Sequence, residues 1–445
     1  MTEIRSEINS FEENIAREAV ERALRLGADA ARVTINKSTT DEVGTLNGEI
    51  EHVIHCLDRS LTLALFIGGR YGTFSTNRLE SSELEKFISG GIDITTMFQE
   101  DSCRALPEPE RKEKSALSGN ELSLCDNAYP EITQVRRVEL ARRGMAWGAS
   151  CPDYKLVSEE CAYSNHYFDT LVLDSGGLYA RHRETSFEYG ADVTIEDSKG
   201  NLCSGYWWDA SPRLSELKAE GCSARAIARA AAQIGSRKAA SGTYRIVVDT
   251  ECAARLVAPL LNALGGYALQ QNNSFLRDSL GRKIFGDNVT IIDRCREAGA
   301  TGSRLFDSEG VATQERAIIE NGVVKMYFLN EYIARKLSCP GTVEDASRPT
   351  LLPTAEHLIA GIENGIRISG FNGGNSNSAT GDFSYGIEGF MIRNGKIAEP
   401  VSEAVMTGNF VTLWNNMLAA GSDSRPCMSR QIPTLVFDKV EISGI

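Results

Sequence analysis

Residues 244–266 constrain the fold of this chain most, because they read as one strand that continues directly into one helix. Residues 244–249, Tyr-Arg-Ile-Val-Val-Asp, form a β-branched run that favours a strand. Asp249 or Thr250 is expected to accept hydrogen bonds from the free N–H groups of the helix, whose dipole favours Glu251 in the first turn. The C-terminal half is therefore expected to form around this element.

The predicted helix has one apolar face and ends at Gly265 and Gly266. Its apolar residues recur at steps of three and four: Leu256, Val257, Leu260, Leu261 and Leu264. In a zinc peptidase, such a helix is a natural place for two His that hold the metal and a Glu that activates water. The sequence from Cys252 to Arg277 contains no His, Asp or Glu, so we predict a core helix without a metal site.

The composition predicts a globular protein of two or three domains, because the chain has 445 residues and is 42% hydrophobic. A formal charge of −13 argues against a groove for phosphate backbones, so no direct nucleic-acid partner is expected. Eleven scattered cysteines without a CxxC pair predict reduced thiols and a cytoplasmic location. No stretch approaches the roughly 20 apolar residues of a membrane span, so no membrane contact is expected.

Four regions follow from the pattern of elements, and together they predict an α+β fold. Residues 1–99 are expected to form an N-terminal α+β subdomain, with helices on a mixed or antiparallel sheet. Residues 100–127 are polar and predict an exposed linker or long loop. Residues 128–220 predict a helix followed by a β-meander, and residues 221–445 a mainly antiparallel, barrel- or sandwich-like domain with a few helices.

Two helix predictions are specific enough to be checked. Ser10 and Glu13 have the spacing of a capping box, so the first helix is expected to begin there. The Ala-rich residues 213–238 predict one long helix that leads into the strand at residue 244.

The five histidines give no metal-ligand spacing with Cys or carboxylates. His52 and His55 lie three apart in a predicted strand, so their side chains point to opposite faces. His357, beside Glu356 and after Pro353, is the best single candidate for a residue placed in a cleft. The alternative is a hydrogen-bonded surface histidine, the more common situation for a lone His.

Residues 370–389 are rich in Gly, Asn and Ser but match neither a P-loop nor a dinucleotide-binding motif. One interpretation is a backbone-lined wall against which an extended peptide lies. The other is that the glycines permit tight turns between strands. The candidate peptide-binding residues are Gly373, Gly374, Thr380, Gly381, Asp382, Ser384, Gly386 and Gly389, together with His357.

Several short runs in the chain resemble the signatures of the TldD/PmbA family. The C-terminal runs are Thr-Gly-Asp-Phe-Ser-Tyr-Gly at 380–386, Glu-Gly-Phe at 388–390, Asn-Gly-Lys-Ile at 394–397, Pro-Val-Ser-Glu at 400–403 and Gly-Asn at 408–409. Upstream runs that match are residues 72–77, 274–276, 280–281 and 306–311. The resemblance covers nearly the whole chain.

The family has two branches, and the resemblance implies the one without a catalytic motif. The TldD branch resembles a zinc peptidase with a HExxxH helix, while the PmbA or TldE branch lacks this motif and pairs with TldD. By approximate register the motif would fall near Ala258, Pro259 and Ala263, which can neither bind zinc nor activate water. The chain departs from the family at Glu356, His357 and Leu358, where an Asn-containing motif is usual.

The resemblance implies a subunit of a cytoplasmic metalloprotease complex that acts on unfolded or modified peptides, and also an older label, modulator of DNA gyrase. The expected partner is a TldD-like HExxxH subunit that holds zinc, with no catalytic residue, metal or other cofactor in this chain. Contact with an extended peptide is expected at the edges of strands in the C-terminal domain. Two alternatives stay open: a stand-alone peptidase with an atypical site that includes His357, and a homodimeric peptide-binding module.

Overall fold

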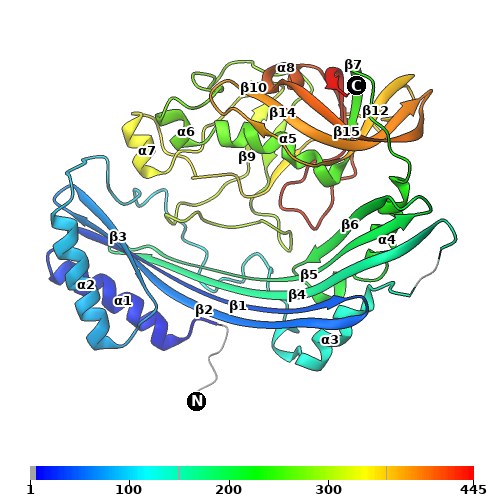
Figure 1. Ribbon diagram of the computed structural model, residues 1–445. Coiled ribbons are helices and arrows are strands. Elements are labelled where there is room, and N and C mark those ends of the chain that lie inside the picture. The colour runs from blue at the N-terminus through cyan, green and yellow to red at the C-terminus, as the bar shows by residue number, and fades with distance from the viewer. Residues whose placement is uncertain (1–6, 149–150, 357, 445) are drawn as a thin grey trace.

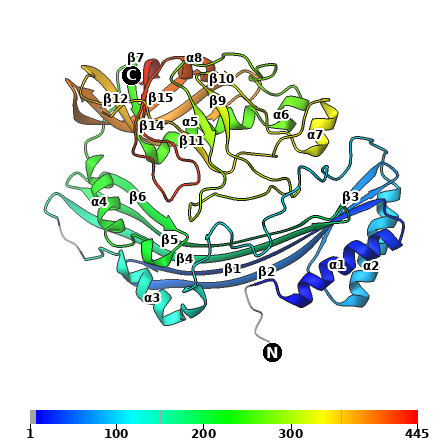
Figure 2. The ribbon, with the colours of Figure 1, turned by 180° about the vertical axis from the view of Figure 1, so that it is seen from behind.

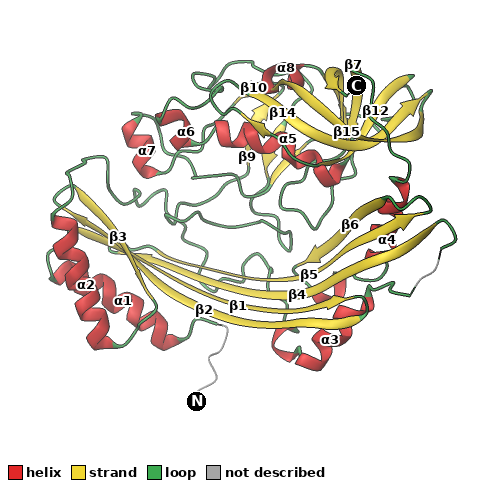
Figure 3. Ribbon diagram, viewed as in Figure 1, coloured by secondary structure: helices red, strands yellow, loops and turns green. Residues whose placement is uncertain are grey.

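The computed structural model describes residues 7–148, 151–356 and 358–444, and the chain forms two layers (Figure 1). A long curved sheet built from the N-terminal half forms one layer, and a compact C-terminal domain with its own strands forms the other (Figure 1, Figure 2). Strands are prominent in both layers, and α1, α2 and α3 lie on the side of the long sheet that faces away from the C-terminal domain (Figure 3). Among the described residues, no helix is both long and apolar enough to span a bilayer.

The first layer is a six-stranded antiparallel sheet with the order β3-β2-β1-β4-β5-β6. Its strands are β1 Ala30–Leu46, β2 Glu49–Ile67, β3 Arg70–Thr76, β4 Tyr154–Asp174, β5 Tyr179–Asp197 and β6 Leu202–Ser211. Because β1 pairs with β4, strands of the predicted regions 1–99 and 128–220 belong to one sheet. The two predicted subdomains therefore share a single sheet, in which β1 pairs with β2 on one side and with β4 on the other.

Four helices cover one face of this sheet in two groups. Helices α1 Ser10–Arg25 and α2 Ser81–Thr96 pack at one end, while α3 Gln134–Arg143 and α4 Cys222–Ala232 share a second core at the other end (Figure 1). Helix α1 is capped one residue earlier than predicted, because the Asn9 and Glu12 side chains each accept the other's backbone N–H.

The predicted long helix at residues 213–238 is wrong in its extent. A short 3₁₀ turn at Leu214–Glu216 precedes α4, and Gly221 at the helix N-cap has a φ of 78°. This left-handed conformation cannot continue a right-handed helix, so α4 begins at Cys222 and ends at Ala232.

Residues 100–127 contain no helix or strand, as predicted, but they are not an exposed linker. They bury three apolar side chains between the two layers: Ala116, Leu122 and Leu124. Lys112 forms an ion pair with Asp174 of the sheet, at 2.7 Å, and Glu113 pairs with Arg296 of the C-terminal domain. The polar composition of residues 100–127 suggested exposure, because the ion-pair partners of their charged side chains lie in distant parts of the sequence.

The C-terminal domain contains a closed ring of strands in the order β12-β7-β17-β15-β14, which returns to β12. Its strands are β7 Gly242–Val248, β12 Asn364–Phe371, β14 Asp382–Arg393, β15 Lys396–Asn409 and β17 Leu435–Ser443. All pairs are antiparallel except β7 with β12. This barrel confirms the predicted α+β class.

The remaining C-terminal elements are short. A four-stranded sheet has the order β10-β9-β8-β11. Its strands are β8 Ile291–Asp293, β9 Arg316–Glu320, β10 Val323–Val324 and β11 Pro349–Leu351. Outside this sheet, β13 Asn375–Ser376 pairs with β14, and β16 Met417–Ala420 pairs with β17. The helices are α5 Thr250–Ala263, α6 Gly266–Gln270, α7 Glu331–Lys336 and α8 Phe410–Asn415.

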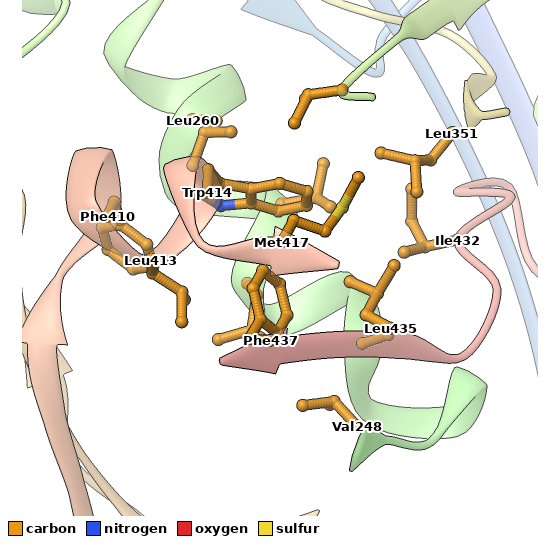
Figure 4. Packing of buried hydrophobic residues seen from close by; sticks show 14 of the residues in the cluster. Val248, Leu260, Leu351, Phe410, Leu413, Trp414, Met417, Ile432, Leu435 and Phe437 are labelled. Carbon is orange, nitrogen blue, oxygen red and sulfur yellow. The ribbon is translucent and has the colours of Figure 1, made fainter. Parts of the chain in front are cut away.

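One core fills the C-terminal domain. Trp414, on α8, lies edge to face against Phe437 of β17, with ring centroids 5.4 Å apart (Figure 4). Leu260 of α5 and Val248 of β7 belong to the same cluster (Figure 4). The predicted element at residues 244–266 is therefore central to this domain, as expected.

Candidate functional site

Helix α5 is positioned by its apolar face, as the sequence predicts. Leu256, Val257 and Leu260 are fully buried in the core of the C-terminal domain. On other sides of the helix Arg255 and Asn262 are exposed, and Ala258 is half-buried. Only residues at these more open positions can face a ligand.

Asp249 occupies the N-cap of α5, but its side chain makes no capping hydrogen bond. Its Oδ1 accepts a hydrogen bond from Arg367 Nε of β12 at 2.7 Å, which corrects the expected contact with the helix N–H groups. Asp249 is only 4% exposed. Its Oδ2 has no hydrogen-bond partner within the described parts of the chain. Burial raises the pKa of Asp249, while the hydrogen bond from Arg367 lowers it.

Arg255 ties α5 to the glycine-rich segment. Its Nη2 donates to the carbonyl oxygens of Gly373 and Gly374, at 3.2 and 3.3 Å. The guanidinium also lies 4.8 Å from the centroid of the Tyr385 ring, a distance suited to a cation–π contact. The loop between β12 and β13 is therefore attached to the helix one turn before the half-buried Pro259.

The polar candidates from the sequence hold their own turn together. Thr380 Oγ1 donates to Asp382 Oδ2 at 2.6 Å, and Asn409 Nδ2 donates to Asp382 Oδ1 at 2.9 Å. These hydrogen bonds, that from Asn409 above all, lower the pKa of Asp382. Ser384 is exposed on β14, opposite Asn375 of β13.

Most of the candidate glycines have a steric reason to be glycine. A Cβ atom would lie 2.0 Å from the Ser384 carbonyl oxygen at Gly374, and 1.8 Å from the Arg367 carbonyl oxygen at Gly389. At Gly386 it would lie 2.2 Å from Asn372 Oδ1, and Gly381 has a φ of 80° against the Phe275 ring. Gly373, with a φ of 144°, faces open space. A turn conformation with positive φ accounts for Gly373, Gly374 and Gly381, while close approach of neighbouring atoms accounts for Gly386 and Gly389 within β14. The peptide-binding role of these residues stays a prediction.

His357 lies outside the described residues. Among the residues that are described, no group of three or more His, Cys, Asp and Glu side chains is arranged to hold a metal ion. Ala258, Pro259 and Ala263 of α5 offer no donor atom in their side chains, so these positions do not fit zinc.

A cleft with a volume of about 610 Å³ lies between the two layers, at the N-terminal end of α5. β6 and α4 form one wall, and α5, β12 and β14 form the other. Gly370 and Glu388, at the root of the glycine-rich segment, line it. The wall of β6 carries Tyr206, Trp207 and Trp208, which are not among the residues predicted from the sequence. Two of the four Trp of the chain occur there side by side, a signal that could have identified the site.

Arginines surround the aromatic wall. The guanidinium of Arg425 lies 4.4 Å from the centroid of the Trp207 ring, and that of Arg229 lies 5.8 Å from it. Arg425 Nη2 also donates to the Trp208 carbonyl oxygen, and Arg229 Nη2 donates to the Ser369 carbonyl oxygen at 2.9 Å. These contacts fix the arginines and join the sheet to the barrel across the cleft.

Comparisons with known proteins agree along the chain. Family models described as PmbA/TldA metallopeptidase central domain and C-terminal domain match residues 129–234 and 241–444. A protein from Escherichia coli O157:H7 named metalloprotease PmbA is 27% identical over 439 residues, which covers 97% of this chain and 96% of that protein.

Solved structures show the same fold. A Bacteroides thetaiotaomicron protein named a modulator of DNA gyrase has 37% identity and a TM-score of 0.94, covering 98% of this chain and all of its own. TldE from Thermococcus kodakarensis has 19% identity and a TM-score of 0.82, with coverage of 98% and 100%.

Proposed function

Because this chain belongs to the PmbA/TldD metallopeptidase family, we propose that it is a subunit of a cytoplasmic peptidase complex in which a partner chain holds the catalytic zinc. The complex acts on unfolded or modified peptides. The observation that supports the proposal is the chemistry of α5, where Ala258, Pro259 and Ala263 lie near the place that the family's HExxxH motif would take by approximate register.

Zinc hydrolysis needs donor atoms and a base, and these residues supply neither. Such a helix must supply two imidazole nitrogens that reach the same metal ion and a carboxylate that accepts a proton from water. A methyl group at residues 258 and 263 and a proline ring at residue 259 occupy this space instead. Helix α5 acts as a support for the barrel and for the loop that Arg255 holds.

A role in handling peptides is supported by the cleft between the layers. Its volume of about 610 Å³ suits a few residues of polypeptide, and it combines aromatic side chains with charged groups of both signs. Recognition of varied unfolded peptides requires contacts to the backbone and to general side-chain properties, which such a cleft provides.

The proposed partner is a TldD-like chain with an intact HExxxH helix, in a heterodimer with this chain. The test is to express this chain together with such a paralogue from the same genome and to measure co-purification and digestion of unfolded casein. We expect the pair to cleave casein and each chain alone to cleave it poorly. A pair in which the motif Glu of the partner is replaced by Gln is the matched control, and it should assemble without cleavage.

Full casein cleavage by the partner alone, unchanged on addition of this chain, would contradict the proposal. A stable homodimer of this chain that binds peptides and ignores the paralogue would instead support a peptide-binding module. Cleavage by this chain alone would support a stand-alone peptidase.

A further inference from the structure

Three arginines surround the ring of Trp207 at the edge of the cleft. The guanidinium of Arg425 lies 4.4 Å from the centroid of this ring, that of Arg225 lies 5.2 Å from it, and that of Arg229 lies 5.8 Å from it. Arg225 and Arg229 are four residues apart on α4, so their side chains are neighbours on one face of the helix. Arg425 follows β16 in the C-terminal domain. Positive groups from both layers therefore meet at one aromatic side chain.

Carboxylates balance only part of this charge. Asp209 Oδ1 lies 3.8 Å from Arg425 Nη2, and within the described residues no other carboxylate oxygen comes within 4.0 Å of the guanidinium groups at Trp207. Three guanidinium charges less one carboxylate charge leave two positive charges, in a chain whose formal net charge is −13. Charges of one sign repel each other at short distance, so an anion placed among them is favoured.

The other acidic side chains of the cleft lie elsewhere. Asp249 is 2.7 Å from Arg367, so these two residues balance each other. Glu251 and Glu388 belong to α5 and β14 of the barrel wall. Asp192 is opposite Tyr206 in the pairing of β5 with β6, and burial raises the pKa of its carboxyl group, which favours the uncharged form.

Most donors of the three arginines at Trp207 are unused. Arg229 donates from Nη2 to the Ser369 carbonyl oxygen at 2.9 Å, and Arg425 donates from Nη2 to the Trp208 carbonyl oxygen. Arg225 donates no hydrogen bond to any residue that the structure describes. Because each guanidinium has five N–H donors, the cluster can bind a ligand with several acceptor oxygens.

A phosphoryl group matches this cluster better than a carboxylate does. It has three terminal oxygens and a charge near −2 at neutral pH, whereas a carboxylate has two oxygens and one charge. Arginine binds phosphate through two parallel N–H donors, so three guanidinium groups can share the three oxygens.

The cleft leaves room for an organic group attached to the phosphate. Its volume of about 610 Å³ far exceeds that of a bare ion, and Trp207, Arg229 and Arg425 all line it. Tyr206, which is 51% exposed in the same cleft, offers an aromatic surface beside the arginines.

We propose that Arg225, Arg229 and Arg425 form a binding site for a phosphoryl group at Trp207. Its source is either free phosphate or a phosphate monoester whose organic part lies in the cleft. The inference goes beyond the proposed function, because it requires no partner chain, no zinc and no peptide. It can be tested on this chain alone.

The test is isothermal titration calorimetry of the isolated full chain with inorganic phosphate and with phenyl phosphate, at constant ionic strength. Both should bind. Phenyl phosphate that binds about tenfold more tightly would identify a monoester as the ligand, and equal affinities would identify free phosphate. Affinity should rise between about pH 5 and 7, because the second phosphate proton is lost near pH 6. Benzoate, an aromatic carboxylate, should bind about tenfold more weakly than phenyl phosphate.

Arg225 provides the cleanest variant, because the structure gives it no hydrogen bond or ion pair within the described residues. Arg225→Gln should weaken the binding of both phosphate compounds about tenfold without changing the melting temperature. Arg225→Lys keeps the charge but not the paired donors, so it should recover part of the affinity. The matched control is Arg142→Gln, which removes the same charge at an exposed position of α3 and should leave binding unchanged.

Three results would overturn the inference. They are no binding of either phosphate compound at about 10 mM, equal weakening by Arg225→Gln and Arg142→Gln, and benzoate binding as tight as that of phenyl phosphate. Failure of the co-expressed pair to cleave casein would concern the proposed function and not this site.

Discussion

The two layers of the molecule differ in the length of their strands, in the number of their cores and in whether their sheet has open edges. The six-stranded sheet has long regular strands, two separate cores under its helices, and open edges at β3 and β6. The C-terminal domain has shorter, interrupted strands around one large core, and its barrel closes on itself. Closure removes the edges of a sheet, so the open sheet keeps the capacity to add a strand and the barrel does not.

This difference changes the expected place of peptide contact. From the sequence, strand addition is expected at the edges of the C-terminal domain, but the barrel offers little free edge. Strand β13 has only two residues, and the terminal strands β10 and β11 of the small sheet have two and three. Strand β6, with ten residues, offers a longer edge beside the cleft.

The largest effect is expected from a change in the barrel core. Trp414 is fully buried against Phe437, so Trp414→Ala should lower the free energy of unfolding by about 3–5 kcal/mol. Tyr206→Ala, at the exposed sheet edge, should change it by less than about 0.5 kcal/mol. Urea unfolding of both variants measures this difference. An equal decrease in the free energy of unfolding for the two variants would contradict it.

A smaller effect is expected at the junction of barrel and cleft. Arg367→Ala removes the hydrogen bond to Asp249 Oδ1 and leaves a buried carboxylate without its donor, which should cost about 1.5–3 kcal/mol. Adding Asp249→Asn should recover part of this loss, because the buried charge is then absent. A double-mutant cycle in urea measures the coupling, and strictly additive losses would show that the pair does not interact.

The contact between the layers should depend on pH. Burial, and next the Glu344 carboxylate, raise the pKa of Asp307 to about 7. The folded state then holds a proton that the unfolded state releases near its ordinary pKa of about 4, so stability falls as pH rises from about 4 to 7. This group contributes a slope of at most about 1.4 kcal/mol per pH unit.

The matched variant is Glu344→Gln, which removes the neighbouring charge. It should lower the pKa of Asp307 and flatten the decline of the melting temperature between about pH 4 and 7. An identical profile for both proteins would show that Glu344 does not influence Asp307.

The smallest effect on stability is expected at the glycine-rich loop. Arg255→Ala removes two long hydrogen bonds at an exposed site, which should change stability by less than about 1 kcal/mol. Hydrogen exchange at residues 372–381 should nevertheless become faster, while Arg255→Lys should retain part of the protection. Unchanged exchange in Arg255→Ala would mean that the loop is held by its own turn alone.

The sequence predicted elements whose cause is local. The strand and helix at residues 244–266 follow from a β-branched run and an apolar periodicity, and both appear at β7 and α5. A barrel- or sandwich-like domain was predicted, but its closure depends on the pairing of β7 with β12. In this pair Arg245 lies opposite Gly365, 120 residues further along the chain. No local pattern determines such a contact.

The candidate site was harder to predict for the same reason. Its walls come from Tyr206, Asp249 and Glu388, which lie in three separate stretches and meet only when the layers pack. Conversely, Thr380 and Asp382 looked functional in sequence because they are polar and close together, yet in the structure they hydrogen-bond each other. Polar side chains in a short loop often stabilise that loop.

The central claim is that this chain contributes structure and peptide contacts but not the hydrolytic centre. The most direct test is the metal content of the untagged chain purified alone, measured beside digestion of unfolded casein by the same sample. The account predicts no bound zinc and no cleavage. One zinc per chain together with cleavage would contradict it, and His357→Ala would then show whether that histidine belongs to the site.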